Sequence, residues 1–277
     1  MPELPELQAH AERLSADFSG AVLAGFGPIT FTALKTFRPD PSEAAGTPIA
    51  GFGRRGKYLL IEAGPITFVV HLMQGGRLRP DDKQSAKPRG GIARWTFEDG
   101  RALLLTEPGT ERRAGVWVVA GDIETQDPIL GLGPDADTLD GAGWTVVLAQ
   151  RSGRLHGVLR DQHAVAGVGR RLANEICHRA KLSPFANASK LAPDQVAILA
   201  AAVRECIAES LAAERAQTEM VKSAERGGIH HGAGQPCPRC GDVLRTVEYR
   251  TYTVVYCPTC QTGGKVLADN TTSKFLK

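Results

Sequence analysis

Cys237-Pro238-Arg239-Cys240 and Cys257-Pro258-Thr259-Cys260 are the most informative stretches of this sequence. The 16 residues between them contain two β-rich runs, Val243–Tyr249 and Thr251–Tyr256, with Arg250 at their junction. Four thiolates complete the tetrahedral coordination of zinc and leave no open position for catalysis. The spacing therefore predicts a β-hairpin closed by one structural zinc ion, whose ligands are Cys237, Cys240, Cys257 and Cys260.

The chain before this module has two kinds of sequence pattern. Up to about residue 130, short β-like runs are separated by Gly and Pro, which is typical of a sandwich or barrel. The runs are Tyr58–Glu62, Ile66–Leu72, Ala93–Phe97, Ala102–Thr106 and Val116–Ala120. Residues 145–220 instead have helical periodicity, and the clearest helix begins near Pro193, a favourable first-turn position.

These patterns predict an α+β fold: an N-terminal β-sandwich with flanking helices, a C-terminal helical domain and a four-cysteine zinc-finger β-hairpin. The Gly- and Pro-rich stretch that begins at Leu130 indicates a linker. We therefore expect a sandwich domain at 2–130, a linker at 131–144, a helical domain at 145–228, a zinc finger at 229–262 and a tail at 263–277.

Composition and charge narrow the class of protein. The chain has 42% apolar and 23% charged residues, as in globular proteins. Its net charge of +3 is unevenly divided, with −4 in residues 1–150 and +7 in residues 151–277. A basic C-terminal half favours a polyanionic partner. The acidic start of the chain lacks the pattern of a signal peptide, and no apolar run could span a membrane, so we expect a cytoplasmic protein.

The N-terminal sequence Met1-Pro2-Glu3-Leu4-Pro5-Glu6 together with the zinc hairpin resembles the formamidopyrimidine-DNA glycosylase/endonuclease VIII family. The resemblance covers essentially the whole chain. Its other motifs are Gly56-Lys57-Tyr58-Leu59, His71-Leu72 before Gly75-Gly76, Arg112-Arg113-Ala114-Gly115, Leu132-Gly133-Pro134, and Gly167-Val168-Gly169 before Ala173-Asn174-Glu175. It implies a helix–two-turn–helix domain at 145–228 and a monomeric, nucleoid-associated base-excision-repair DNA glycosylase with AP lyase activity on damaged double-stranded DNA.

The resemblance also assigns catalytic residues within the sandwich domain. Loss of Met1 would expose the secondary amine of Pro2, and α-amino groups titrate near pH ~8, so part of the amine is unprotonated at neutral pH. Such an amine can attack the sugar C1′ and expel the base through a Schiff base. By resemblance, Pro2 is the nucleophile and Glu3 the acid/base group. Lys57 would assist elimination, and Glu6 would support the site electrostatically.

The same resemblance places DNA contacts in both halves of the chain. His71 would lie on a loop that enters the DNA near the lesion, followed by Met73 and Gln74 at the wedge that fills the gap left by a flipped base. The Gly167-Val168-Gly169 turn would present helix N-terminal amides to phosphate. The predicted DNA-binding residues are His71, Met73, Gln74, Arg112, Arg170, Arg171 and Arg250.

Several positions depart from the family pattern. An aromatic wedge is missing, because Ala114 follows Arg112-Arg113, and Arg170 replaces the usual phosphate-binding Asn. Tyr252 stands where the hairpin arginine is expected, five residues before Cys257, although Arg250 is close enough to substitute. The segment 216–236 lacks the length of the loop that caps 8-oxoguanine. These departures favour oxidised pyrimidines and abasic sites over 8-oxoguanine, without excluding ring-opened purines.

Two other functions fit parts of the sequence. A catalytically silent damaged-DNA-binding protein of the same fold would explain why the phosphate-binding Asn, the hairpin Arg and the aromatic wedge, a Phe, are absent. The presence of Pro2, Glu3 and Lys57 opposes this alternative. A zinc-dependent base deaminase would combine His10-Ala11-Glu12 with Pro236-Cys237 and Cys240. The second cysteine pair already completes the zinc site, so the deaminase is disfavoured.

Overall fold

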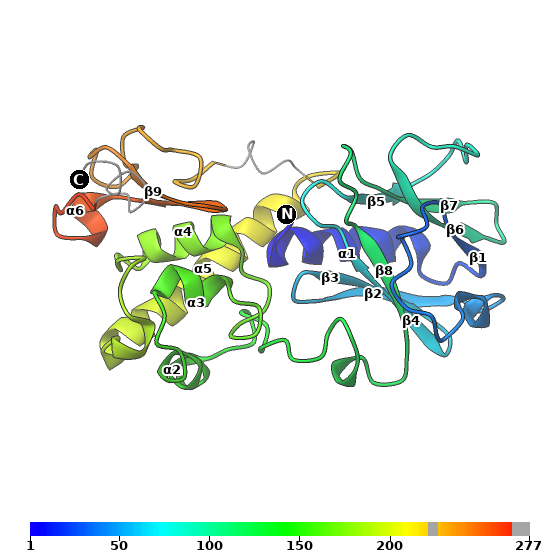
Figure 1. Ribbon diagram of the computed structural model, residues 1–277, viewed down its shortest axis with the longest axis horizontal. Coiled ribbons are helices and arrows are strands. Elements are labelled where there is room, and N and C mark those ends of the chain that lie inside the picture. The colour runs from blue at the N-terminus through cyan, green and yellow to red at the C-terminus, as the bar shows by residue number, and fades with distance from the viewer. Residues whose placement is uncertain (221–226, 268–277) are drawn as a thin grey trace. The chain divides into compact units, whose positions relative to one another are not determined.

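The chain forms two compact units in the computed structural model, which describes residues 1–220 and 227–267. The first unit comprises residues 1–2 and 6–131, and the second comprises residues 3–5 together with the chain from Leu132 onward. The predicted α+β class is confirmed, with sheets in the N-terminal part and helices and a hairpin in the C-terminal part (Figure 1). The predicted linker 131–144 includes the first residues of helix α2, which begins at Gly141.

Two antiparallel four-stranded sheets build the first unit. One sheet has the strand order β1 (Leu23–Pro28), β6 (Gly91–Phe97), β7 (Ala102–Thr106), β5 (Arg77–Pro80). The other has the order β2 (Ile49–Arg55), β3 (Tyr58–Ala63), β4 (Ile66–His71), β8 (Gly115–Ala120). Helix α1 (Leu4–Phe18) and the 3-10 turns η1 (Pro41–Ala44) and η2 (Ile123–Thr125) accompany them.

Aromatic side chains hold the two sheets face to face. Phe68 of β4 lies 5.2 Å from Phe26 of β1 and 5.8 Å from Trp95 of β6, measured between ring centroids. Helix α1 joins this core through Phe18, whose ring lies 5.1 Å from that of Phe97 and 6.4 Å from that of Phe52. Full burial of one such side chain contributes about 1.5–3 kcal/mol.

All five predicted strands are present, but β1, β2 and β5 were not predicted. Their sequences, LAGFGP, IAGFGRR and RLRP, contain Gly, Pro and Arg, which are poor strand signals by themselves. They form because neighbouring strands supply hydrogen bonds and buried surface: β2 pairs with β3 along its length, and β5 pairs with β7.

Helices and the zinc hairpin make up the described part of the second unit. The helices are α2 (Gly141–Ala149), α3 (Leu155–Arg160), α4 (Arg170–Arg179) and α5 (Pro193–Arg215), with η3 (Ala188–Lys190) before α5. The hairpin consists of β9 (Arg245–Tyr249) and β10 (Tyr252–Tyr256) and leads to α6 (Pro258–Gln261). Helix α5 begins at Pro193, as predicted. Trp144, Leu172, Ile176, Leu199 and Val203 are fully buried in the helical core.

No helix among the described residues is long and apolar enough to cross a membrane.

Candidate active site and nucleic-acid interface

The Glu3 carboxylate caps the N-terminus of α4. Its Oε1 accepts a hydrogen bond from the Arg171 amide at 3.0 Å, and its Oε2 accepts one from the Leu172 amide at 2.9 Å. The residue at the N-cap, Gly169, has no side chain to satisfy these amides. Because unpaired amides at a helix N-terminus favour a negative group, the helix fixes the carboxylate in one orientation.

Glycine at position 169 is what allows this carboxylate to approach. A Cβ atom there would lie 2.2 Å from Glu3 Oε1, far inside van der Waals contact. Gly167 adopts a left-handed φ of 95°, and its carbonyl accepts a hydrogen bond from the Leu4 amide at 3.0 Å. We predicted that amides following this Gly-x-Gly motif would face phosphate, but two of them are engaged by Glu3 instead.

The first unit contains the other predicted catalytic groups. Pro2 and Glu6 are buried, and Lys57 is half-buried after Gly56, whose left-handed φ of 55° turns the chain between β2 and β3. Burial, then the positive charge of Lys57 and that of the chain's amino terminus, lowers the pKa of His71 to about 4. The unit therefore places Lys57 and the amino terminus within electrostatic range of a neutral histidine.

His71 is the last residue of β4 and is 8% exposed, so the prediction that it lies on a loop is corrected. Its ring packs 4.7 Å from that of Tyr58, and its Nδ1 accepts a hydrogen bond from the Met73 amide at 3.3 Å. Met73 follows with a left-handed φ of 51°, and Gln74 is exposed. His71 thus supports the turn whose tip presents Met73 and Gln74.

Arg112 lies in an exposed loop that Glu107 organises. The buried Glu107 carboxylate accepts hydrogen bonds from the backbone amides of Arg113 and Ala114 at 2.6 and 2.7 Å. The Arg112 side chain is exposed, and its Nε lies 3.4 Å from the Gly109 carbonyl. Glu107 could not be singled out from the sequence, because an acidic residue between strands ordinarily indicates a solvated loop.

The tip of the zinc hairpin borders an open, polar hollow of about 570 Å³. Arg170 lines it, with Nη1 3.5 Å from the Thr251 carbonyl, and the exposed Arg250 in the turn lines it too. Arg171 is different: its side chain is 6% exposed and its Nη1 lies 3.4 Å from Ser210 Oγ. The side chain of Arg171 is thus buried within the helical domain, which disfavours the predicted DNA contact, and that contact stays a prediction.

Two tyrosines at the hairpin tip contact arginines at the two ends of α3. The rings of Tyr249 and Tyr252 stack at 4.6 Å. Arg154 donates a hydrogen bond to the Tyr249 hydroxyl at 2.6 Å, and the Arg160 guanidinium lies over the Tyr252 ring at 3.8 Å. Sequence reasoning missed both arginines, because they are about 90 residues from the hairpin in the chain.

Beneath this hairpin lies a buried histidine. His156 is 2% exposed, and its ring lies nearly parallel to that of Tyr252 at 5.9 Å. Burial, then the charges of Arg160 and His230, lowers the pKa of His156 to about 3. The positive charge near the hairpin tip therefore comes from arginine side chains and not from this histidine.

The four zinc-finger cysteines converge as predicted. The Sγ atoms of Cys237, Cys240, Cys257 and Cys260 all lie within 4.8 Å of one another. A tetrahedral site with Zn–S bonds of about 2.3 Å requires sulfur–sulfur separations of about 3.8 Å, so the cluster fits a structural zinc ion. The deaminase alternative finds no support: His10 Nε2 donates to the Leu78 carbonyl at 2.8 Å, and burial lowers the pKa of His10 to about 4.

Comparison with known families agrees with this architecture. Residues 1–117 match the formamidopyrimidine-DNA glycosylase N-terminal domain, residues 130–222 the H2TH domain of the same enzymes, and residues 234–263 a zinc finger found in FPG and IleRS. A formamidopyrimidine-DNA glycosylase of Geobacter metallireducens is 31% identical over 273 residues, which cover 95% of this chain and 100% of that protein. The chain belongs to the formamidopyrimidine-DNA glycosylase family.

Other members of the formamidopyrimidine-DNA glycosylase family are similar to parts or all of the chain. An uncharacterised formamidopyrimidine-DNA glycosylase-like protein of Mycobacterium tuberculosis is 41% identical over 149 residues, which cover 53% of this chain and 94% of that protein. The crystal structure of the Lactococcus lactis enzyme, bound non-covalently to DNA with an AP site, has a TM-score of 0.80 at 20% identity. The match covers 94% of this chain and 99% of that one, so the two share their fold over these lengths.

Proposed function

We propose that this chain is a base-excision-repair DNA glycosylase with AP lyase activity, and that Pro2 is its nucleophile. The observation that carries the proposal is the fixed carboxylate of Glu3, which two α4 amides hold at 2.9 and 3.0 Å. Glu3 directly follows Pro2 in the chain, so an oriented acid/base group lies one residue from the candidate amine. Family membership and the matching domains support the same activity.

The chemistry assigns a separate step to each group. The Pro2 nitrogen forms a bond to the sugar C1′, the base leaves with the electron pair of the glycosidic bond, and the amine proton is transferred to the base or to water. The Glu3 carboxylate takes up a proton from water and transfers it to the ring oxygen, which opens the sugar and leaves an iminium ion at C1′. Removal of a C2′ proton then breaks the C3′–O bond and releases the phosphate, a step that Lys57 assists.

DNA contacts are proposed from the exposed residues of each unit. Met73 and Gln74 at the turn after β4 fill the space of a flipped base, and Arg112 binds nearby DNA. Arg170 and Arg250 at the hairpin bind phosphate, which should make the affinity strongly salt-dependent. The partner is double-stranded DNA with a damaged base or an abasic site, as in the Lactococcus structure, and the protein acts as a monomer in the cytoplasm.

Oxidised pyrimidines and abasic sites are the proposed preferred substrates. The turn after β4 offers Met73 and Gln74 without an aromatic partner, because Ala114 is buried where a second wedge is expected. The expected weakness toward 8-oxoguanine concerns the segment 216–236, of which residues 221–226 lie outside the described part of the chain. A lesion panel that compares oxidised pyrimidines, ring-opened purines and 8-oxoguanine tests this preference.

Borohydride trapping on a duplex with one abasic site tests the proposed lyase. Mass spectrometry should first establish that Met1 is absent, since a retained methionine blocks the amine. The mature protein should become covalently attached to DNA, and Pro2→Gly should form the adduct more slowly, because a glycine amine still forms an imine. Absence of an adduct, with a free Pro2 and measurable DNA binding, would favour the silent damaged-DNA-binding protein.

A further inference from the structure

The zinc module is attached along helix α4. The Val255 amide of β10 donates to Asn174 Oδ1 at 3.3 Å, and the His230 amide donates to Glu175 Oε1 at 3.0 Å. Beyond the end of α4, Gln261 Nε2 donates to the Leu182 carbonyl at 3.0 Å. Polar groups on α4 thus hold the module at several points, and the last turn of the helix makes a contact with the zinc site itself.

That contact joins His178 to a zinc ligand. His178 Nε2 lies 3.2 Å from Cys237 Sγ, and both residues are buried, with 7% and 3% of their surface exposed. A zinc-bound thiolate has no proton to donate, so the imidazole N–H must be the donor. The Arg239 amide approaches the same sulfur at 3.4 Å, which gives Cys237 two hydrogen-bond donors.

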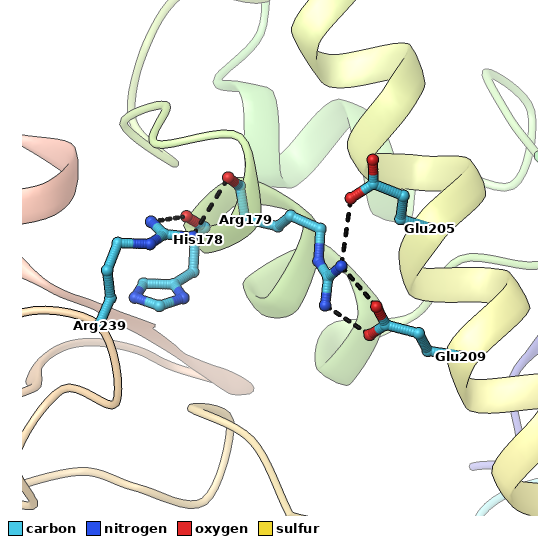
Figure 2. Close-up of polar contacts among 5 residues, drawn as sticks. All are labelled: His178, Arg179, Glu205, Glu209 and Arg239. Atoms are coloured by element: carbon cyan, nitrogen blue, oxygen red, sulfur yellow. Dashed lines mark hydrogen bonds and ion pairs between the residues drawn. The ribbon is translucent and has the colours of Figure 1, made fainter.

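Arg239 of the first cysteine pair binds the end of the same helix. Its guanidinium donates to the carbonyls of His178 at 2.7 Å and Arg179 at 3.3 Å (Figure 2). These carbonyls belong to the last turn of α4, where a cation is favourable because the helix ends with negative partial charge. From there the Arg179 guanidinium reaches Glu205 and Glu209 of α5, at 3.2 and 2.7 Å (Figure 2).

We propose that His178 is a positioning residue of the zinc site, which orients the Cys237 thiolate and ties zinc retention to helix α4. The imidazole fixes the sulfur from the helix side, while Arg239 fixes the helix end from the module side. Hydrogen-bond partners of metal ligands typically change metal affinity by about 10–100-fold when they are removed. The inference concerns metal binding alone and stands whether or not the proposed lyase activity is found.

Competition for zinc between the purified protein and a chelator tests the proposed role of His178. His178→Phe fills the space but removes the donor, and its zinc affinity, measured against a chromogenic chelator at neutral pH, should fall about 10–100-fold. His178→Gln keeps an N–H donor and should retain more of the affinity than His178→Phe does. Arg179→Gln is the matched control: it changes the neighbouring residue without touching the thiolate, and its zinc affinity should match that of the unmodified protein.

A spectroscopic measurement separates hydrogen bonding from general destabilisation. In the cobalt(II)-substituted protein, a donor to the thiolate stabilises the sulfur lone pair and raises the energy of the sulfur-to-cobalt charge-transfer band. His178→Phe should therefore shift this band to lower energy, and Arg179→Gln should not. If His178→Phe does not fold, imidazole ¹⁵N shifts of the unmodified zinc protein should show a proton on Nε2. Zinc affinities within about twofold of each other, an unshifted band or an Nδ1–H tautomer would overturn the proposal.

Discussion

The position of the Glu3 carboxylate depends on the absence of a side chain at Gly169. A methyl group there would lie 2.2 Å from Glu3 Oε1, so Gly169→Ala must displace the carboxylate or the start of α4. We expect base excision by this variant to fall by about 100-fold, since displacement of a catalytic group by about 1 Å costs that much. Single-turnover kinetics on a damaged duplex measures it, with DNA affinity determined separately.

Gly157→Ala provides the control for this substitution. Gly157 lies inside α3, and a Cβ atom there meets nothing within 4 Å. Alanine in a helix interior should stabilise the fold by about 0.5–1 kcal/mol and leave the excision rate unchanged. Equal excision rates for the two alanine variants would show that the α4 turn does not position Glu3.

Individual residues show where sequence reasoning reached its limit. The four zinc ligands could be predicted because their spacing alone defines the coordination. The partners of Glu3 could not, because the amides of Arg171 and Leu172 are about 170 residues away in the chain. Burial of the Arg171 side chain could not be predicted from the sequence either. A charged residue after a Gly-x-Gly turn gives no indication of which way its side chain points.

At the level of elements, α3 brings an arginine to the hairpin tip, and we predict that this arginine contacts DNA. Tyr252 stands where the family resemblance led us to expect an arginine, and the Arg160 guanidinium lies 3.8 Å from the centre of its ring. Contact with a ring face leaves the guanidinium N–H groups at the edge able to bind phosphate. Within the described residues, the Arg160 side chain makes no hydrogen bond or ion pair.

Arg160→Gln should therefore weaken binding to duplex DNA at low salt. The slope of log affinity against log salt concentration should become shallower by about 0.9, the contribution of one phosphate contact. Titrations at several salt concentrations measure the slope. The matched control is Arg204→Gln on the exposed surface of α5, which should keep the slope of the unmodified protein. Identical slopes for Arg160→Gln and the control would exclude Arg160 from the DNA interface.

A helix or strand could be predicted where its own residues show a clear pattern. Strands β3, β4, β6, β7 and β8 and the start of α5 follow from apolar runs and a favourable Pro193. Strands β1, β2 and β5 did not, because pairing overrides their glycines and prolines: β1 pairs with the distant β6, β5 with β7, and β2 with the adjacent β3. The docking of α3 against the hairpin also depends on contacts between distant segments, so periodicity within either segment could not reveal it.

For the whole molecule, buried histidines make stability depend on pH. Burial, the largest cause, lowers the pKa of His10 from 6.5 to about 4, and the pKa of His71 is lowered similarly. Above pH 6.5 both the folded and the unfolded chain carry neutral His10, so the group contributes no pH dependence. As the pH falls from 6.5 to 4, the unfolded chain binds a proton that the folded chain does not, and stability decreases. Below about pH 4 the loss is complete and amounts to about 3 kcal/mol for His10.

Replacement of His10 by glutamine separates the contribution of His10 to acid destabilisation from the contributions of the other titratable groups. Glutamine retains an N–H donor for the Leu78 carbonyl but does not titrate. Denaturant unfolding at about pH 7 and about pH 4.5 should show that His10→Gln loses about 2 kcal/mol less stability between the two conditions than the unmodified protein does. His163→Gln, at an exposed position, should lose as much as the unmodified protein. If His10→Gln loses as much as His163→Gln, burial of neutral His10 does not limit acid stability, and the cause must lie with the other buried groups.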